Sequence, residues 1–228
     1  MLEQLIDIDT RLTLALNGSD SLFLDGLAVT LTATLTWLPA ALVLFYVLVK
    51  NNDTVTLILT LLALALCILV ADQVASSVFK PLVARYRPAG DPSLMHLVDV
   101  VDGYRGGRYG FFSSHAANTF AVATCLGLIV RSRVLSFVLV AWALVNCWTR
   151  LYLGVHYVGD LLCGTLWGIF TGWALHLLYA RLAPVRTKPT MGGVYTPGGY
   201  AVSDVRLLVA ALATLLLLST FVPWLRPL

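Results

Sequence analysis

Residues 54–79 read TVTLILTLLALALCILVADQVASSVF, an apolar run in which Asp72 is the ionisable side chain. Roughly 20 consecutive apolar residues are enough for a helix to cross the hydrocarbon core of a bilayer. Similar runs recur along the chain, which has 228 residues, is 59% hydrophobic and 12% charged, and has a mean hydropathy of +0.85. Soluble domains carry about 25% charged residues. The composition therefore predicts an integral membrane protein and excludes a soluble one.

The apolar runs predict an all-α membrane protein, a bundle of six transmembrane helices in a single domain. The predicted spans cover approximately 22–49, 54–79, 114–130, 134–152, 156–180 and 205–224. The segment before them, 2–18, reads LEQLIDIDTRLTLALNG. Its leucines lie mostly toward one helical face, whereas Asp7, Asp9 and Arg11 interrupt the pattern. We expect an amphipathic helix that lies in the membrane interface, because this segment is too charged to cross.

The charges between the spans predict how the bundle is oriented. An even number of spans places both termini and the long polar segment 80–113 on one side. The other side carries the basic residues Lys50, Arg131, Arg133, Arg181, Arg186 and Lys188. The positive-inside rule places this second side in the cytoplasm. The segment 80–113 has arginines of its own, but they are gathered in one loop, which indicates a task other than topology. We therefore expect that loop outside the cytoplasm.

The first polar segment at this outer side is KPLVARYRP, residues 80–88. Lys80 and Arg87 are seven residues apart, close to two helical turns, so both cations are expected on one side of a helix. Pro81 suits the first turn of a new short helix. Pro88 would end that helix near Arg87.

The second polar segment is FFSSHAAN, residues 111–118. A serine just before an apolar run is a good N-cap. The start of a helix offers free backbone N–H groups and the positive end of the helix dipole, which together form a ready anion site. His115 would stand in the first turn beside it.

The third polar segment is WTRLYLGVHYVGDLL, residues 148–162. Arg150 ends one predicted helix and His156 begins the next. His156 and Asp160 are four residues apart, so they are expected to share a helix face. A carboxylate in that position can accept the imidazole N–H, fix the tautomer and stabilise the imidazolium, as in the hydrolase triads.

Each of these residues has an ordinary explanation when taken alone. Basic side chains at span ends reach toward the interface, and histidines or carboxylates near helix starts often cap or pack. The combination is more informative, because ionisable groups at membrane depth are costly and tend to be functional. Three cations around a helix start describe a phosphate pocket. Two histidines beside that pocket can supply a nucleophile and a general acid.

The three segments resemble the motifs of the type 2 phosphatidic acid phosphatase (PAP2) superfamily of membrane lipid phosphatases, which read K-x6-R-P, P-S-G-H and S-R-x5-H-x3-D. The similarity includes the bacterial undecaprenyl-diphosphatase and lipid A phosphatase branches. The first motif matches in full, and in the third Thr149 replaces the leading serine. In the second, FSSH at 112–115, Phe112 replaces proline and Ser114 replaces glycine. Ser114 keeps its backbone N–H, so we expect the site to survive.

The resemblance implies a mechanism. His156 would attack phosphorus to form a phosphohistidine, and Asp160 would hold His156 and stabilise its charge. His115 would protonate the leaving oxygen and then help to activate water. The phosphoryl oxygens would be held by backbone N–H groups and by Lys80, Arg87, Ser113, Ser114 and Arg150. The resemblance implies no metal and no cofactor, because cations of the protein take that role. The four cysteines fall inside apolar runs without metal-ligand spacing.

Further residues are possible secondary members of the site. Asp72 either pairs with an arginine or caps a polar interior, and a structural ion pair competes with a catalytic role. Arg105 and Arg108 lie in the Gly-rich GYRGGRYG of residues 103–110. They either touch a second phosphate or headgroup, or remain solvated. Asn118 and Tyr152 could line the site.

The resemblance implies a single PAP2-like domain over 1–228, with its catalytic core at about 72–180 and an additional C-terminal span at about 205–224. The expected function is hydrolysis of a lipid phosphate or diphosphate in the bacterial inner membrane, with the site facing the periplasm or cell exterior. Candidate substrates are undecaprenyl diphosphate, lipid A phosphate and phosphatidylglycerol phosphate. The alternatives are a lipid phosphotransferase that uses the same phosphohistidine, and a non-catalytic lipid-binding or transport protein. The expected partners are the lipid substrate and the bilayer, without nucleic acid. Nothing in the sequence indicates an oligomeric state, and the loop 89–109 is expected to set headgroup choice.

Overall fold

The computed structural model describes residues 2–184 and 193–225. Within these ranges the regular structure is helical, and two isolated bridges, Tyr86 with Tyr109 and Tyr195 with Ala201, are the only β pairings. Five helical segments are long and apolar enough to cross a membrane: Thr34–Asn51, Thr54–Val83, Arg133–Tyr152, Val158–Leu182 and Val202–Ser219. The sixth predicted span is the shorter apolar helix Ser114–Val130. The prediction of an all-helical membrane protein is confirmed.

The helices follow the chain in a simple order. They are α1 (Leu2–Leu16), α2 (Leu22–Thr32), α3 (Leu38–Asn51), α4 (Thr54–Gln73), α5 (Lys80–Val83), α6 (Ser114–Val130), α7 (Arg133–Tyr152), α8 (Val158–Leu182) and α9 (Val202–Ser219). Short 3₁₀ turns lie at Thr34–Trp37, Pro88–Gly90, Val101–Gly103 and Val222–Leu225, and a π-helical turn, Val74–Phe79, joins α4 to α5. Between α8 and α9, residues 185–192, with Arg186 and Lys188, lie outside the described ranges.

The first predicted span, 22–49, is wrong as a single helix, because the chain breaks between α2 and α3. Pro39 lies at the start of α3, where its missing N–H costs nothing. Just before it, the Thr36 hydroxyl and the Trp37 indole N–H donate to carbonyl oxygens in the last turn of α2, at 2.5 and 2.9 Å. These side chains satisfy carbonyl groups that would otherwise accept from a continuing helix.

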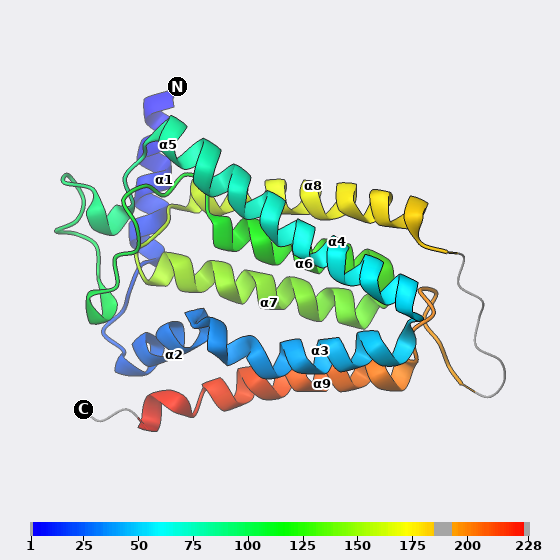
Figure 1. The fold of residues 1–228 in the computed structure, drawn as a ribbon. Helices are drawn as coiled ribbons and strands as arrows, with labels where there is room; N and C mark the ends of the chain where they lie inside the picture. Colours follow the sequence, from blue (N-terminus) through cyan, green and yellow to red (C-terminus); the bar gives the residue numbers. More distant parts are fainter. Residues whose placement is uncertain (1, 185–192, 226–228) are drawn as a thin grey trace.

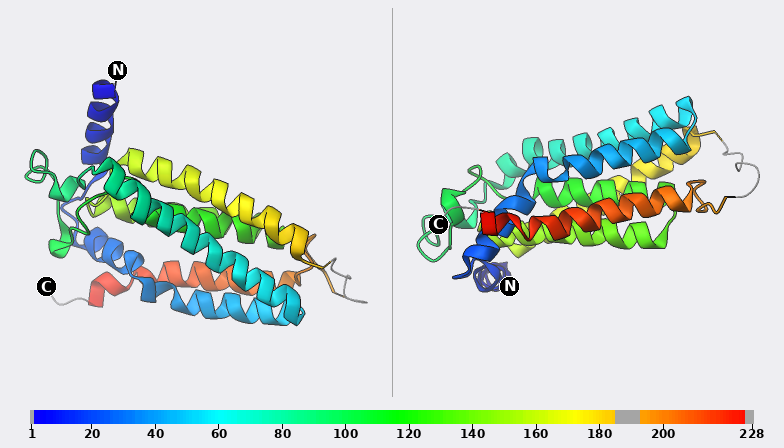
Figure 2. Two further views of the ribbon diagram at one scale, coloured as in Figure 1. Left: turned by 45° about the horizontal axis from the view of Figure 1, so that its top comes forward. Right: turned by 90° about the horizontal axis from the view of Figure 1, so that it is seen from below.

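The long helices run side by side, and α6 lies among α4, α7 and α8 while α3 packs along α9 (Figure 1). The loop between α5 and α6 gathers at one end of this bundle. The short turns after α3 and α6 lie at the opposite end. Helix α1 crosses the first end steeply, as both views of Figure 2 show. Many of its apolar side chains are exposed. Its location in the membrane interface stays a prediction.

Helices α6 and α8 approach closely along a row of glycines. A Cβ added to each of these glycines would lie within 2.4–2.5 Å of a backbone oxygen of α6 or of its N-cap. The three contacts are Gly164 with Ser113, Gly168 with Ala117 and Gly172 with Ala121. Small residues at every fourth position allow helix backbones to approach in this way inside membranes. The start of α6 is therefore held at a fixed place beside the start of α8.

Candidate active site

His156 and Asp160 lie together at the start of α8, although not on a shared helix face. The prediction that His156 begins the helix is wrong, because α8 begins at Val158 and His156 lies in the turn before it. Asp160 is the third residue of α8, where its Oδ2 accepts from the backbone N–H of Tyr157 at 3.1 Å. The same Oδ2 lies 3.2 Å from His156 Nδ1, and both side chains are buried. A helix-capping geometry brings the pair together, not helical periodicity.

The surroundings of His156 hold its ring in the neutral form. Burial lowers the pKa of His156 to about 4, Asp160 opposes this shift, and the nearby cations Arg87 and Lys80 add to it. Because a carboxylate can only accept, the pairing with Asp160 places the ring proton on Nδ1. Nε2 then carries the unprotonated lone pair, which can accept from Arg87. It faces Arg87, whose Nη1 lies 3.4 Å away.

Arg87 reaches the site from extended chain. The predicted helix through Lys80 and Arg87 is wrong, because α5 ends at Val83 and the next residue, Ala84, has a left-handed φ of 50°. Pro88 drives Arg87 into an extended conformation (φ −74°, ψ 152°). The Arg87 guanidinium donates to the carbonyl oxygens of Tyr109 and Val155 at 3.2 and 3.3 Å. Pro81 does lie in the first turn of α5, as predicted.

Lys80, the first residue of α5 directly after the π-helical turn, points toward the start of α6. Its Nζ donates to the hydroxyls of Ser114 and Ser76 at 3.2 and 3.1 Å. Ser76 in turn donates to Asp72 at 3.3 Å. Asp72 therefore lies one hydroxyl removed from Lys80, and among the described residues it forms no ion pair with an arginine. π-Helical turns of this kind are frequent at functional sites.

Arg150 is a buried cation with spare hydrogen-bonding capacity. Its side chain is 1% exposed at the end of α7. Nη1 donates to the Tyr104 hydroxyl at 3.1 Å and lies 3.5 Å from His115 Nε2. Within the ranges the structure describes, Nη2 has no hydrogen-bond partner. Buried polar groups are almost always paired, so this N–H group indicates a place for an anion.

The start of α6 faces these cations. The predicted N-cap is confirmed at Ser113, whose Oγ accepts from the backbone N–H of Ala116 at 3.4 Å. The backbone N–H of Ser113 donates to the Asp160 carbonyl oxygen at 3.1 Å, which ties α6 to α8. His115 is exposed in the first turn, between the contact of Ser114 with Lys80 and its own contact with Arg150. The helix start, the three cations Lys80, Arg87 and Arg150, and the two histidines therefore lie in one cluster.

The possible secondary residues of the site differ in their contacts. Arg105 donates to the carbonyl oxygen of Ala89. Arg108 donates to the Tyr86 hydroxyl at 3.2 Å and lies over two tyrosine rings of the loop. The Tyr152 hydroxyl is bonded to Asp25 and Ser19, both at 2.7 Å, on the side of α2. The buried Oδ1 of Asn118 lacks a partner among the described residues.

Sequence reasoning missed three residues of the site: Arg85 and Gly110 beside Asp160, and Tyr104 beside Arg150. Arg85 Nη1 lies 3.4 Å from Asp160 Oδ1. A Cβ on Gly110 would lie 2.9 Å from Asp160 Oδ2, so the loop backbone passes directly over the pair. Tyr104 binds Arg150, as described above. Arg85 stands inside KPLVARYRP, and the other two stand inside GYRGGRYG, so both quoted stretches contained the signal.

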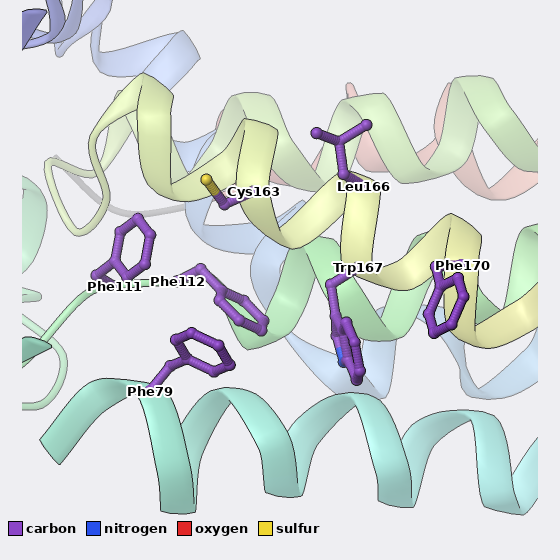
Figure 3. A pocket seen from close by; sticks show the side chains of 7 residues that line it. All are labelled: Phe79, Phe111, Phe112, Cys163, Leu166, Trp167 and Phe170. Carbon is purple, nitrogen blue, oxygen red and sulfur yellow. The ribbon is translucent and has the colours of Figure 1, made fainter. Parts of the chain in front are cut away.

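An apolar pocket of about 390 Å³ opens beside the polar cluster, between α4 and α8 (Figure 3). Its walls are Phe79, Phe111, Phe112, Cys163, Leu166, Trp167 and Phe170. The pocket is continuous with the cluster along the chain, because Phe79 precedes Lys80 and Phe112 precedes Ser113. The rings of Phe79 and Phe112 lie 5.1 Å apart where the two regions meet. In the described part of the chain, no group of three or more His, Cys, Asp or Glu residues is placed to hold a metal ion.

The fold and site define a helical membrane protein with a buried histidine–carboxylate pair ringed by cations. Residues 54–184 match the family model of the PAP2 superfamily. The chain is 42% identical over 197 residues to a lipid A 4'-phosphatase of Bacteroides thetaiotaomicron, covering 84% of this chain and 88% of that protein. It is 32% identical over 182 residues to a lipid A 4'-phosphatase of Porphyromonas gingivalis, covering 79% and 77%. The protein belongs to the PAP2 superfamily.

A solved structure has the same fold. It is that of a transmembrane PAP2-type phosphatidylglycerolphosphate phosphatase from Bacillus subtilis, with a TM-score of 0.60 and 19% sequence identity. The match covers 80% of this chain and 90% of that chain. The resemblance stated from the three motifs is thus confirmed at the level of the family.

Proposed function

We propose that this protein is a metal-independent lipid phosphatase that removes a phosphate from lipid A through a phosphohistidine. The observation that carries this proposal is the buried Nη2 of Arg150, which has no partner among the described residues, in the same cluster as neutral His156 and its carboxylate partner Asp160. A buried cation with a free N–H group calls for an anion, and a histidine with a free lone pair next to it can attack phosphorus. The names of the two relatives favour lipid A over undecaprenyl diphosphate and phosphatidylglycerol phosphate as the substrate.

In the proposed reaction the Nε2 lone pair of His156 forms a bond to phosphorus while the bond from phosphorus to the lipid oxygen breaks. His115 donates its proton to that leaving oxygen. The positive charge that develops on His156 is stabilised by Asp160. In the second half, His115 accepts a proton from water, the water oxygen bonds to phosphorus, and the phosphorus–nitrogen bond breaks. The products are the dephosphorylated lipid and inorganic phosphate, with His156 restored.

The cations supply the charge stabilisation that a metal supplies in other phosphatases. Lys80, Arg87 and Arg150 converge with the backbone N–H of Ser114 at the start of α6, whereas that of Ser113 is already bonded to Asp160. Preorganised donors of this kind stabilise charge as it spreads over the phosphoryl oxygens in the transition state. Two of the cations already contact catalytic groups, since Arg87 lies 3.4 Å from His156 and Arg150 lies 3.5 Å from His115. We propose that the reaction therefore needs no metal ion.

The apolar pocket supports a lipid substrate over a soluble phosphate ester. It opens between α4 and α8 at the level of the phenylalanines that adjoin Lys80 and Ser113. An acyl chain in this pocket would keep its contact with apolar side chains while the phosphate lies among the cations.

We propose a bacterial inner-membrane location with the site facing the periplasm. The end of the bundle opposite the site carries Lys50, Arg131, Arg133 and Arg181. The positive-inside rule assigns that end to the cytoplasm. In this arrangement 1–228 form one domain, with the core at about 72–180 and α9 as the additional span at about 205–224.

The test is phosphate release in detergent with EDTA present. The substrates are lipid A, undecaprenyl diphosphate and phosphatidylglycerol phosphate, and the lipid products are identified by mass spectrometry. We expect release from lipid A, and a loss of roughly 10³-fold or more in His156→Ala. The exposed His96 gives the matched control, His96→Ala, which should retain full activity. Release that survives His156→Ala, or that requires an added metal, would sink the mechanism. A product in which phosphate has moved to an acceptor would instead establish a transferase.

A further inference from the structure

Helix α1 caps the helix that carries Asp160. The backbone N–H of Gly159 donates to Asp9 Oδ1 at 2.7 Å, and that of Val158 donates to Thr13 Oγ1 at 3.1 Å. The first N–H groups of a helix have no partner within the helix. Here two of them are satisfied by α1, from about 150 residues earlier in the chain. The Thr13 hydroxyl also donates to the Asp9 carbonyl oxygen at 2.7 Å, which orients it for this contact.

The same aspartate shares an arginine with Asp160. Arg85 Nη1 lies 2.8 Å from Asp9 Oδ2 and 3.4 Å from Asp160 Oδ1. The guanidinium is held 3.6 Å over the ring of Tyr157, so it cannot turn freely toward either carboxylate. The shorter contact goes to Asp9. Arg85 contacts Asp160 through Oδ1, so Oδ2 remains for His156 Nδ1 at 3.2 Å and the backbone N–H of Tyr157 at 3.1 Å.

The contact between α1 and α8 is tight. A Cβ on Gly159 would lie 2.9 Å from Asp9 Oδ2, inside the distance that side chains tolerate. Asp9 is 16% exposed and Thr13 is buried. Asp7, on the same helix, forms instead an exposed pair with Arg11, with side chains 55% and 77% exposed. Only one of these two aspartates of α1 meets the bundle.

We propose that Asp9 and Thr13 are positioning residues for the reaction: they fix the start of α8 and hold Arg85, and so set the geometry of Asp160 against His156. This inference rests on the proposed role of His156 as nucleophile. It makes the N-terminal helix part of the catalytic apparatus, in addition to any membrane contact.

The first experiment compares steady-state kinetics of single variants. Asp9→Asn keeps an oxygen for Gly159 but removes the charge facing Arg85, and Thr13→Val removes the acceptor for Val158. We expect kcat to fall roughly tenfold in each while KM changes little, because misplacement of a catalytic group lowers the rate more than binding. Thr13→Ser should restore the rate, and Asp7→Asn is the matched control with wild-type kcat. A change in KM with kcat at the wild-type value would overturn the inference.

The second experiment approaches the contact from α8 and needs no turnover. Gly159→Ala inserts a methyl group against Asp9. Site-resolved modification by diethyl pyrocarbonate then reports on His156, with the exposed His96 as internal reference. We expect His156 to react severalfold faster in Gly159→Ala, Asp9→Asn and Thr13→Val.

The two experiments separate the two proposals. Unchanged kcat and unchanged reactivity of His156 in all three variants would overturn the role of α1 and leave the phosphatase intact. A wild-type protein that releases no phosphate would overturn the phosphatase. The reactivity of His156 would then decide alone whether α1 fixes the start of α8.

Discussion

Polar networks around a buried aspartate occupy both ends of the bundle, and they differ in how their hydrogen bonds are completed. At the end formed by the starts of α4 and α9, Lys50 Nζ lies 2.8 Å from Asp204 Oδ1, and Asn51 donates to Asp204 Oδ2 at 2.9 Å. Asn51 also accepts from the backbone N–H of Ala201 at 2.8 Å. At the site end, Arg85, Arg87 and Lys80 interact with the one buried carboxylate of Asp160, and Arg150 Nη2 has no partner in the described ranges.

The difference separates a structural network from a binding site. A network whose donors and acceptors satisfy one another stabilises the fold and offers nothing to a ligand. A network with surplus donors is costly until an anion completes it. The site end thus has the surplus donors that the proposed phosphate binding requires, whereas the opposite end joins the α3–α4 turn to the start of α9.

The largest expected effect is at Arg150. Arg150→Met should lower kcat/KM by roughly 10²- to 10³-fold, because a donor to the transition-state charge is lost. Its thermal midpoint in detergent should stay level or rise, since a buried cation without a full set of partners is replaced by an apolar chain of similar length. Phosphate-release kinetics and thermal unfolding on the same preparation check both. A lower midpoint with wild-type activity would reverse the comparison between the two ends.

The next effect concerns pH. The pKa of His156 is about 4 in the folded protein, against 6.5 for an ordinary histidine. The unfolded chain therefore takes up a proton first as the pH falls. The contribution of neutral His156 to the free energy of unfolding is fully present above pH 6.5. It declines by about 3 kcal/mol as the pH drops from 6.5 to about 4. Thermal unfolding across this range should show the decline in the wild type and a smaller one in His156→Gln. An equal decline in both would assign the titration to another group.

A smaller and opposite result is expected at the other end. Asp204→Ala leaves Lys50 and Asn51 without their shared acceptor. We expect the thermal midpoint to fall by several degrees, while kcat/KM per folded molecule stays unchanged. Equal loss of activity and stability would show that the two networks are coupled through the bundle.

The smallest expected effect is that of Arg108, and it tests whether this residue belongs to the site. Arg108 contacts Tyr86 and Tyr109. Its hydrogen bond to the Tyr86 hydroxyl raises the pKa of the guanidinium. Arg108→Ala should leave kcat/KM within about twofold of the wild type, as for most exposed charges. A selective loss with a bisphosphorylated lipid, compared with a monophosphorylated one, would instead bring Arg108 into the site as a contact for the second phosphate.

The sequence predicted the helices best where local signals agreed. The run 114–130 is α6 to the residue, because Ser113 caps its start and Arg131 ends it with a left-handed φ of 57°. The run 22–49 failed because Pro39 and nearby hydroxyl and indole groups close α2 early. The helical placement of Arg87 failed because Pro88 imposes extended chain on the residue before it.

The site was predictable by residue type more than by geometry. The motif residues Lys80, Arg87, Arg150, His156 and Asp160 do converge in the structure. The contacts of Asp9 were not predictable, because they join residues 76 and 150 positions apart and no local pattern reports such a pairing. In the sequence pattern, Asp9 only interrupts the apolar face of the predicted helix. The spacing of Gly164, Gly168 and Gly172 indicates close helix packing. The prediction of the spans did not take that spacing into account.

That glycine row also has a consequence for motion. The backbones of α6 and α8 touch along three successive contacts. If either helix slid or tilted, the two backbones would clash. The start of α6 and the start of α8, with Ser113 bonded to Asp160, therefore move as one rigid body when the bilayer thickens, thins or bends. We therefore expect lipid-induced deformation to fall on the other helices, and the distance between the start of α6 and His156 to change little with the state of the membrane.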